Sequence, residues 1–302
     1  MLFIIGYLGF SNRQPQGLYK SALSLEFMHD FMLVHDDIID KSDLRRGSPS
    51  MHILLNNYLK KFGEVKFKGE DLAIVIGDLI YALGLRAFLC VKADQKFKEK
   101  ALSKFIDATV YTACGEFNEL LSTIKDISKI TREEIYKIYD FKTACYTFAT
   151  PLSMGALLAG AQDTQAERLF QYGMLTGRAF QIKDDILGIF ARESDIGKSV
   201  LSDIKEAKKT LLIWHAYHHS SRKDKFTIES VFSKDNVNRS DLLKLRKLIN
   251  ASGALDYARR EILRLTNQAK NLLCRSAMKS KYKCLLLSYT NEILSICQAI
   301  HK

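Results

Sequence analysis

The segment from Leu18 to Asp40 reads LYKSALSLEFMHDFMLVHDDIID, and its last six residues place three aspartates in a run of Leu, Val and Ile. Apolar residues recur through it at helical spacing, so it predicts a helix. On that helix Asp36 and Asp40 lie one turn apart, and Asp37 lies beside Asp36. An unpaired buried carboxylate costs roughly several kcal/mol. The segment therefore predicts a cation held at the end of a core helix.

A second acidic pair lies far downstream in FQIKDDILG, where Asp184 and Asp185 interrupt another apolar helical stretch. Gly188 stands where a third aspartate would fall. Two acidic clusters in core-like sequence predict facing walls of one cavity. Mg²⁺ prefers oxygen ligands and is usually held by one or two carboxylates together with substrate phosphates. The sequence has no CxxC pair or His/Cys cluster that would favour zinc. These features predict a Mg²⁺ site.

Cationic residues accompany both acidic clusters. Arg45 and Arg46 follow the first in DKSDLRRGSPSMH, Lys142 lies in FKTA, and Lys198 lies in IGKSVLSD after the second. A guanidinium can grip phosphate oxygens through its planar fork. The alternation predicts a diphosphate held by metal on one side and by fixed cations on the other.

Helical periodicity continues through the chain, and no alternating strand pattern stands out. Thr131 and Glu134 predict a capping box, and Gly63, Gly69 and the segment SKDNVNRS predict breaks. The sequence therefore predicts an all-α fold with a single domain over residues 1–302. Besides 17–40, helices are expected near 50–62, 71–92, 95–124, 131–160, 164–190, 203–219, 240–250, 252–276 and 279–300.

Composition narrows the class of protein. The chain has 302 residues, 47% hydrophobic, without an apolar run of roughly 20 residues that would span a membrane. The opening MLFIIGYLGF lacks a basic lead-in and predicts a core helix rather than a signal peptide. Six scattered cysteines without such a signal favour the reducing cytoplasm.

The net charge of +11 comes entirely from the last hundred residues, since 203–302 hold 20 Lys/Arg against 9 Asp/Glu and the rest hold 25 of each. A basic surface can attract a phosphorylated substrate, or it can simply be a solvated helix face. The usual nucleic-acid-binding motifs are missing from the sequence, so no nucleic-acid partner is expected.

Together these motifs resemble the trans-type polyprenyl diphosphate synthases, over about residues 18–275. The resemblance implies an isoprenoid synthase-type helical bundle around a deep central cavity, assembled as a homodimer. It also implies head-to-tail condensation of isopentenyl diphosphate with an allylic diphosphate, with Mg²⁺ as cofactor. The segments that carry it are, in order, HDDIIDKSDLRRGSPSMH, GDLIYALGLRAF, ACGEFNEL, FKTA, GRAFQIKDDILGIF, GKSVLSDIKEAKKT and SGALDYARREI.

The resemblance also implies roles residue by residue. Both acidic clusters bind Mg²⁺ around the allylic diphosphate and, with two lysines, are catalytic. The implied metal ligands are Asp36, Asp37, Asp40, Asp184 and Asp185, and the implied diphosphate contacts are Arg45, Lys142, Lys198, Thr143 and Gln181.

His29 and Arg46 match positions that bind isopentenyl diphosphate. Independently, His29, Asp36 and Asp40 fall on one helical stripe. The family's Gly-Lys-x-x-Arg-Pro element has no counterpart before MLFIIGYLGF, so we expect the chain to lack the family's N-terminal helix. Either that element lies upstream of this sequence, or part of the isopentenyl diphosphate site is missing.

Product length depends on the depth of the cavity. Phe31 lies five residues before Asp36, about 7.5 Å lower along a helix, where a large ring can form the floor. The smaller Met32 leaves some depth beside it, and the alternative is that Phe31 is ordinary core. The resemblance favours geranylgeranyl diphosphate (C20) as product, with farnesyl diphosphate second.

Other functions stay open at this point. A non-catalytic partner subunit of a prenyl synthase would fit the missing N-terminal element. A class I terpene cyclase would use similar metal clusters, but the RRG at Arg45–Gly47 favours condensation. A basic helical nucleic-acid binder is the remaining alternative, and it would not respond to removal of Mg²⁺.

Overall fold

The computed structural model describes residues 1–191, 200–234 and 236–295. Helices predominate among them and the two strands β1 and β2 have two residues each, so the all-α prediction is confirmed. The chain divides into two compact units. The first comprises Met1 and Arg13–Ala93, and the second comprises Leu2–Asn12 and the described residues from Asp94 onward. The expectation of one catalytic domain over residues 1–302 stays a prediction.

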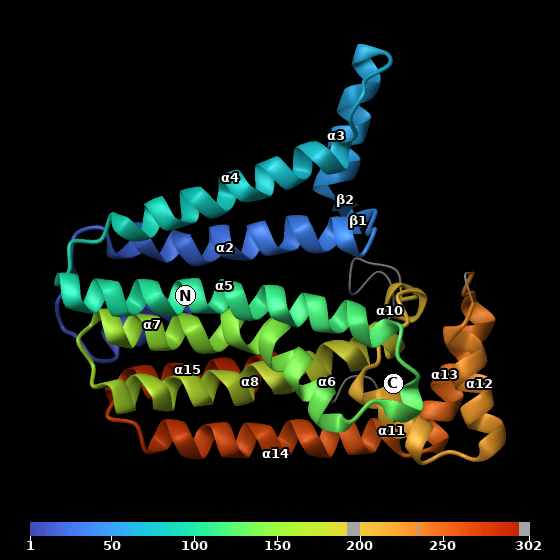
Figure 1. The fold of residues 1–302 in the computed structure, drawn as a ribbon. Helices are drawn as coiled ribbons and strands as arrows, with labels where there is room; N and C mark the ends of the chain where they lie inside the picture. Colours follow the sequence, from blue (N-terminus) through green and yellow to red (C-terminus); the bar gives the residue numbers. More distant parts are fainter. Residues whose placement is uncertain (192–199, 235, 296–302) are drawn as a thin grey trace. The chain divides into compact units, whose positions relative to one another are not determined.

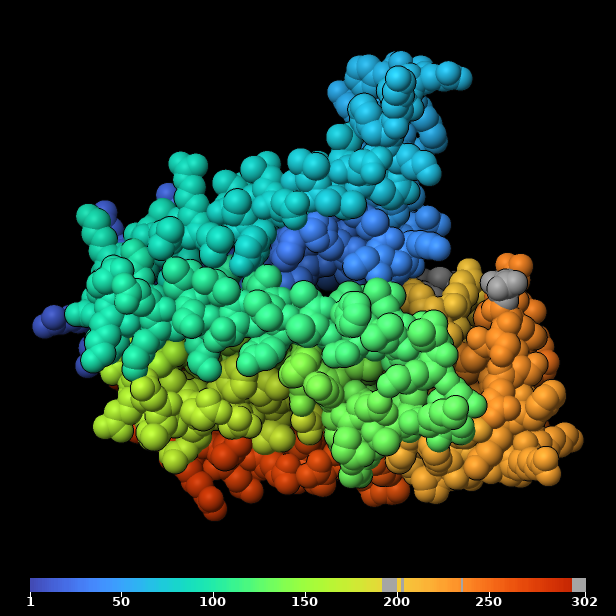
Figure 2. All heavy atoms as spheres, viewed as in Figure 1, coloured from blue at the N-terminus to red at the C-terminus, as the bar shows by residue number. Residues whose placement is uncertain are grey.

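The first unit is built on two long helices that pack along their length, α2 and α4 (Figure 1). The two helices approach closely at Gly77 of α4, where an added Cβ would lie 2.4 Å from Nε2 of His35 on α2. Figures 1 and 2 show the connection between α3 and α4 projecting from this pair. The elements are α2 (Leu18–Ile39), β1 (Leu44–Arg45), β2 (Ser48–Pro49), α3 (Met51–Leu59), η1 (Lys60–Phe62) and α4 (Gly69–Leu89).

Helix α4 exposes much of its apolar surface within its unit. Its Val75 and Leu79 side chains are 65% and 59% exposed. Among the helices of the described ranges, α4 alone is long and apolar enough to cross a membrane by length and composition. Its apolar sequence is interrupted by Asp78 and Arg86, which is why the sequence shows no unbroken apolar run.

In the second unit α5, α7, α8 and α14 run side by side, and α11, α12 and α13 gather at one end (Figure 1). The opening residues form α1, in which Phe3 is 1% exposed, so the predicted core helix is confirmed. The elements are α1 (Leu2–Leu8), α5 (Gln95–Thr123), η2 (Ile127–Lys129), α6 (Arg132–Tyr139), η3 (Asp140–Ala149), α7 (Thr150–Leu158), α8 (Asp163–Phe190), α10 (Ser202–Lys205), α11 (Leu211–His218), α12 (Arg222–Phe232), α13 (Arg239–Ala251), α14 (Ala254–Cys274) and α15 (Ser280–Ser295).

The helix expected over 131–160 changes its winding in the middle, because η3 is a π-helix. The Thr150 N–H donates to the Cys145 carbonyl, five residues back. The next residue is Pro151, which has no N–H and would clash with a carbonyl one turn earlier, so a wider turn fits there. Helix α8 packs against η3 at Gly177, where an added Cβ would lie 2.5 Å from the Ala144 Cα. The π-helix is thereby fixed against α8.

Helix ends follow the local signals. Thr131 and Glu134 form the predicted capping box at the start of α6, so that prediction is confirmed. An analogous box of Asn238 and Asp241 begins α13, and it lies at the end of the segment SKDNVNRS that was predicted as a break. Helix α12 was not expected, because only a narrow apolar stripe runs through its charged sequence. Its start was marked by Ser221, whose side chain accepts a hydrogen bond from the backbone N–H three residues later.

Candidate active site

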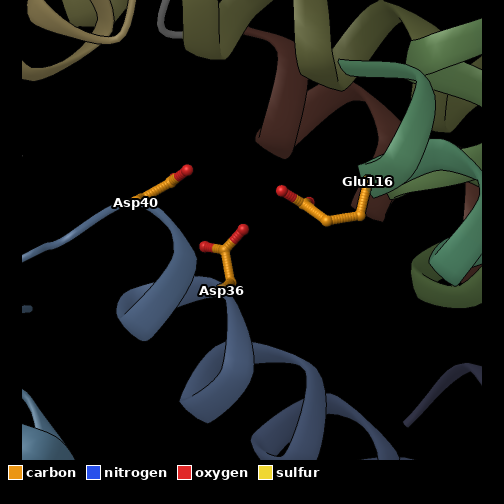
Figure 3. A group of neighbouring side chains, drawn as sticks. All are labelled: Asp36, Asp40 and Glu116. Atoms are coloured by element: carbon orange, nitrogen blue, oxygen red, sulfur yellow. The ribbon is translucent and has the colours of Figure 1, made fainter. Parts of the chain in front are cut away.

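The first acidic cluster occupies the last turn of α2. Carboxylate oxygens of Asp36 and Asp40 lie within 4.8 Å of each other, and both residues are partly exposed. Figure 3 shows their side chains leaving the same side of the helix, one turn apart. The helix ends here because Lys41 adopts a left-handed conformation with φ of 52°. The Ser42 N–H then donates to the Asp37 carbonyl, which closes the helix end.

Asp37 lies differently from its neighbour, since it is only 3% exposed. Nε of Arg45 donates to Oδ1 of Asp37 at 2.9 Å, and Nη2 of Arg45 donates to Oδ2 of Asp36 at the same distance. Burial by itself would lower the pKa of Arg45, but the hydrogen bonds and charges of Asp37 and Asp36 outweigh it and raise that pKa above its ordinary value. One guanidinium therefore bridges the first two aspartates.

A tight hairpin brings Arg45 back to α2. Strands β1 and β2 pair antiparallel, with Arg45 opposite Ser48. The two residues between them, Arg46 and Gly47, both have positive φ, 53° and 79°, which is the signature of a type I′ turn. Glycine adopts this conformation without strain. The RRG sequence thus turns its first arginine inward onto the aspartates and leaves the second exposed.

His29 is half-buried two turns before the aspartates. Burial and the positive charge of Arg46 lower its pKa, so the imidazole is neutral at pH 7. The effect of Arg46 on the pKa of His29 places the two residues near one another, and their assignment to one substrate stays a prediction.

The two residues assigned to chain length lie on different sides of α2. The Phe31 ring packs against His35 and against Tyr81 of α4, with ring centroids 4.7 Å and 5.0 Å away. Met32 instead is spaced one turn from Asp36 and lies on the acidic stripe. Phe31 is thus held between two helices of the first unit, with Tyr81 as a neighbour that the sequence did not reveal.

The second acidic cluster also divides into an exposed and a buried member. Asp184 is exposed on α8, whereas Asp185 is 5% exposed. Gln181 Nε2 donates to Oδ1 of Asp185 at 3.0 Å, and the Tyr139 hydroxyl donates to its Oδ2. Burial and the Asp185 charge raise the pKa of Tyr139 well above its usual value, so the phenol keeps its proton. Tyr139 is a residue of this site that sequence reasoning missed.

The π-helix η3 carries Lys142 and Thr143. Nζ of Lys142 lies 2.8 Å from Oε2 of Glu116 and also bonds Glu119, both on α5. Thr143 Oγ1 donates to Oε1 of Gln181 at 2.7 Å. The two glutamates were missed, although their i, i+3 spacing in ACGEFNEL could have placed them on one helix face.

The structure brings together the predicted residues within each unit. In the first unit these are His29, Asp36, Asp37, Asp40, Arg45 and Arg46, and in the second they are Lys142, Thr143, Gln181, Asp184 and Asp185. Lys198 lies outside the described residues. The expectation that the two acidic clusters face one another across a cavity stays a prediction.

Comparison with known proteins identifies this arrangement. The model of the family described as polyprenyl synthetase matches residues 1–249. A geranylgeranyl diphosphate synthase of Saccharolobus solfataricus is 32% identical over 80% of this chain and 68% of its own length. A geranylfarnesyl diphosphate synthase of Natronomonas pharaonis is also 32% identical, over 84% of this chain and 68% of its own.

Solved structures agree. The geranylgeranyl pyrophosphate synthase of Corynebacterium glutamicum, complexed with isoprenyl diphosphate and magnesium, superposes with a TM-score of 0.87 at 25% identity. The alignment covers 97% of this chain and 84% of that one.

Replacement of Arg45 by Gln tests the bridge between the first two aspartates. The variant leaves the buried Asp37 carboxylate without its charged partner, so we expect the free energy of unfolding to fall by about 1–3 kcal/mol. Urea unfolding measures the loss. Arg46→Gln in the same turn is the matched control, because Arg46 is exposed, and it should change stability by less than about 0.5 kcal/mol. Equal unfolding midpoints for the Arg45→Gln and wild-type proteins would contradict the assigned bridge.

Proposed function

The chain belongs to the polyprenyl synthetase family, and we infer that it is a trans-prenyltransferase that condenses isopentenyl diphosphate with an allylic diphosphate. The observation that carries this proposal is the pair Asp36 and Asp40 on the last turn of α2, whose carboxylate oxygens lie within 4.8 Å of each other. Their donor set contains only carboxylate oxygens, which suits Mg²⁺. Relatives of this identity include prenyl diphosphate synthases with products of more than one length.

The outward aspartates are the candidates to hold Mg²⁺, with Asp36 and Asp40 from one cluster and Asp184 from the other. Asp37 and Asp185 are the inward neighbours, because their side chains are only 3% and 5% exposed. When bound, Mg²⁺ would neutralise negative charge on the diphosphate that leaves the allylic substrate. This supports the assignment of both clusters to the allylic diphosphate.

The chain's cations supply the remaining positive charge. In the proposal Arg45, Lys142 and Lys198 contact the allylic diphosphate, beside Thr143 and Gln181. Glu116 and Glu119 bond the Lys142 ammonium, so it is already oriented before substrate arrives. A fixed cation of this kind stabilises charge that develops as the allylic C–O bond breaks.

The acceptor substrate would lie beside α2. His29 and Arg46 bind the diphosphate of isopentenyl diphosphate, and the neutral imidazole donates a hydrogen bond rather than a full charge. The alkene attacks the allylic carbocation, and a proton is then lost to the departing diphosphate. Apolar walls exclude the water that would otherwise quench the carbocation.

The direct test gives the purified protein Mg²⁺, labelled isopentenyl diphosphate and farnesyl diphosphate. We expect labelled geranylgeranyl diphosphate, separated by chromatography, and loss of the product when Mg²⁺ is chelated. A product that stops at farnesyl diphosphate from shorter starters would assign the alternative activity, farnesyl diphosphate synthesis. Absence of any labelled product, including from a protein extended by the family's N-terminal element, would refute the proposed reaction.

The length of the products made by two variants tests which residue forms the floor of the cavity. We expect Phe31→Ala to yield products longer than C20, because it removes a ring fixed between His35 and Tyr81. Met32→Ala is the comparator on the acidic stripe of the same helix. If Met32→Ala lengthens the products and Phe31→Ala does not, the floor belongs to Met32.

We also place the enzyme in the cytoplasm as a homodimer. Cys90, Cys114, Cys145, Cys274 and Cys284 are free, which suits a reducing compartment. In the second unit, α5 carries a stripe of exposed apolar side chains at helical spacing, comprising Ile106, Val110, Phe117, Leu121 and Ile124. A second copy of the chain would cover this stripe, because the core of a homodimer interface is mostly apolar. Cell fractionation would test the compartment.

Sedimentation velocity tests the dimer. We expect the wild-type protein to sediment at twice the monomer mass of 34.4 kDa. Val110→Glu places a charge in the α5 stripe and should shift the protein toward monomer, because an unpaired charge is costly in an apolar interface. Phe226→Glu on α12 alters an exposed apolar residue outside the stripe and should leave the mass unchanged. A wild-type monomer at micromolar concentration would contradict the dimer.

A further inference from the structure

A chain of hydrogen bonds crosses the second unit and meets at Asp185. From one side Thr143 of η3 donates to Gln181, 2.7 Å, and Gln181 donates to Oδ1 of Asp185, 3.0 Å. From the other side the Leu211 N–H, at the start of α11, donates to the Tyr139 hydroxyl, 2.8 Å, and Tyr139 donates to Oδ2 of Asp185. Four elements, α6, η3, α8 and α11, therefore converge on one carboxylate.

The direction of each bond follows from the chemistry of the donors. A backbone N–H can only donate, so the Leu211 amide occupies the Tyr139 oxygen as acceptor and the phenol proton points to Asp185. On the other side, the Thr143 hydroxyl fixes the orientation of the Gln181 amide, because it bonds the amide oxygen. The amide nitrogen is thereby turned to Asp185. Both oxygens of Asp185 accept, as a carboxylate can and a neutral amide cannot.

Burial makes this arrangement rigid. Tyr139 and Asp185 are each 5% exposed, and Leu211 is fully buried. Water therefore has little access to replace a lost donor, and a buried acceptor without a donor is costly. Asp184, next along α8, points about 100° away around the helix and is exposed. The two aspartates consequently have separate surroundings although they are adjacent in sequence.

We propose that Tyr139 is a positioning residue of the allylic diphosphate site, whose hydroxyl fixes Asp185 and, through it, the orientation of Gln181 and of the turn of α8 that presents Asp184. The proposal rests on the function inferred above. In this role Tyr139 is not a metal ligand and touches no substrate. It acts on metal and diphosphate binding only by holding Asp185 at the junction of α6, α8 and α11.

The test is Tyr139→Phe, which removes one oxygen and keeps the ring. Partners that orient the groups of a metal site typically change metal affinity by about 10-fold when they are removed. We therefore expect the dissociation constant for Mn²⁺, measured by electron paramagnetic resonance with inorganic pyrophosphate present, to rise about 10-fold. In turnover, the KM for the allylic diphosphate should rise, while the KM for isopentenyl diphosphate stays within about two-fold of wild type.

The matched control is Tyr136→Phe, on the same helix. The Tyr136 hydroxyl donates to Oε1 of Glu261 at 2.7 Å, so this variant also removes one partly buried hydrogen bond to a carboxylate. It should leave the Mn²⁺ dissociation constant and both KM values unchanged. If both tyrosine variants change Mn²⁺ binding equally, Tyr139 has only a general structural role and the proposal is overturned.

Asp185→Asn provides a second route should Tyr139→Phe fold poorly by circular dichroism. The substitution replaces one carboxylate oxygen by an NH₂ group, which cannot accept a hydrogen bond, so either Gln181 or Tyr139 loses its acceptor. This variant should therefore show the same rise in the Mn²⁺ dissociation constant. Wild-type Mn²⁺ affinity in either folded variant overturns the proposal. Because Mn²⁺ and pyrophosphate binding needs no turnover, a wild-type protein that binds both but forms no prenyl product would refute the inferred reaction and leave the role of Tyr139 testable.

Discussion

A carboxylate turned into the interior of a helical unit has to be met by donors, because its charge loses the solvation of water. Both acidic clusters meet this requirement, each in its own way. Asp37 is held by the guanidinium of Arg45, which returns to α2 through a two-residue hairpin. Asp185 is held by neutral donors, the Gln181 amide and the Tyr139 phenol. The remaining features of the site follow from these two arrangements.

Each pair of adjacent aspartates is divided into an inward and an outward member. Successive residues on a helix point about 100° apart, so two neighbours cannot face the same way. Asp36 and Asp184 are the outward members, and Asp37 and Asp185 are buried. An acidic pair on a core helix can thus offer one carboxylate to a cation while the other anchors the helix to the surrounding protein. The same geometry places Asp40, one turn later, beside Asp36.

Close contacts and ion pairs fix the π-helix η3 within the second unit. Gly177 allows α8 to approach the π-helix η3, and Arg178 beside it forms a two-point ion pair with Asp140 at the start of that helix. Lys142 is oriented from the opposite side by glutamates of α5. The wide turn of η3 before Pro151 is therefore constrained on both flanks, which suits a segment whose side chains must hold fixed positions.

The sequence by itself determined the helical class, the buried first helix, the capping box at Thr131 and the two acidic clusters, because all of these depend on spacing along the chain. It did not determine which aspartate of each pair is buried, that Arg45 returns to Asp36 and Asp37, or that η3 is a π-helix. Tyr139 is 46 residues from Asp185 and 72 from Leu211, so no local pattern connects them. Only the packing of α6, α8 and α11 decided that contact, since the partner of a buried polar group is whichever donor the fold brings within reach.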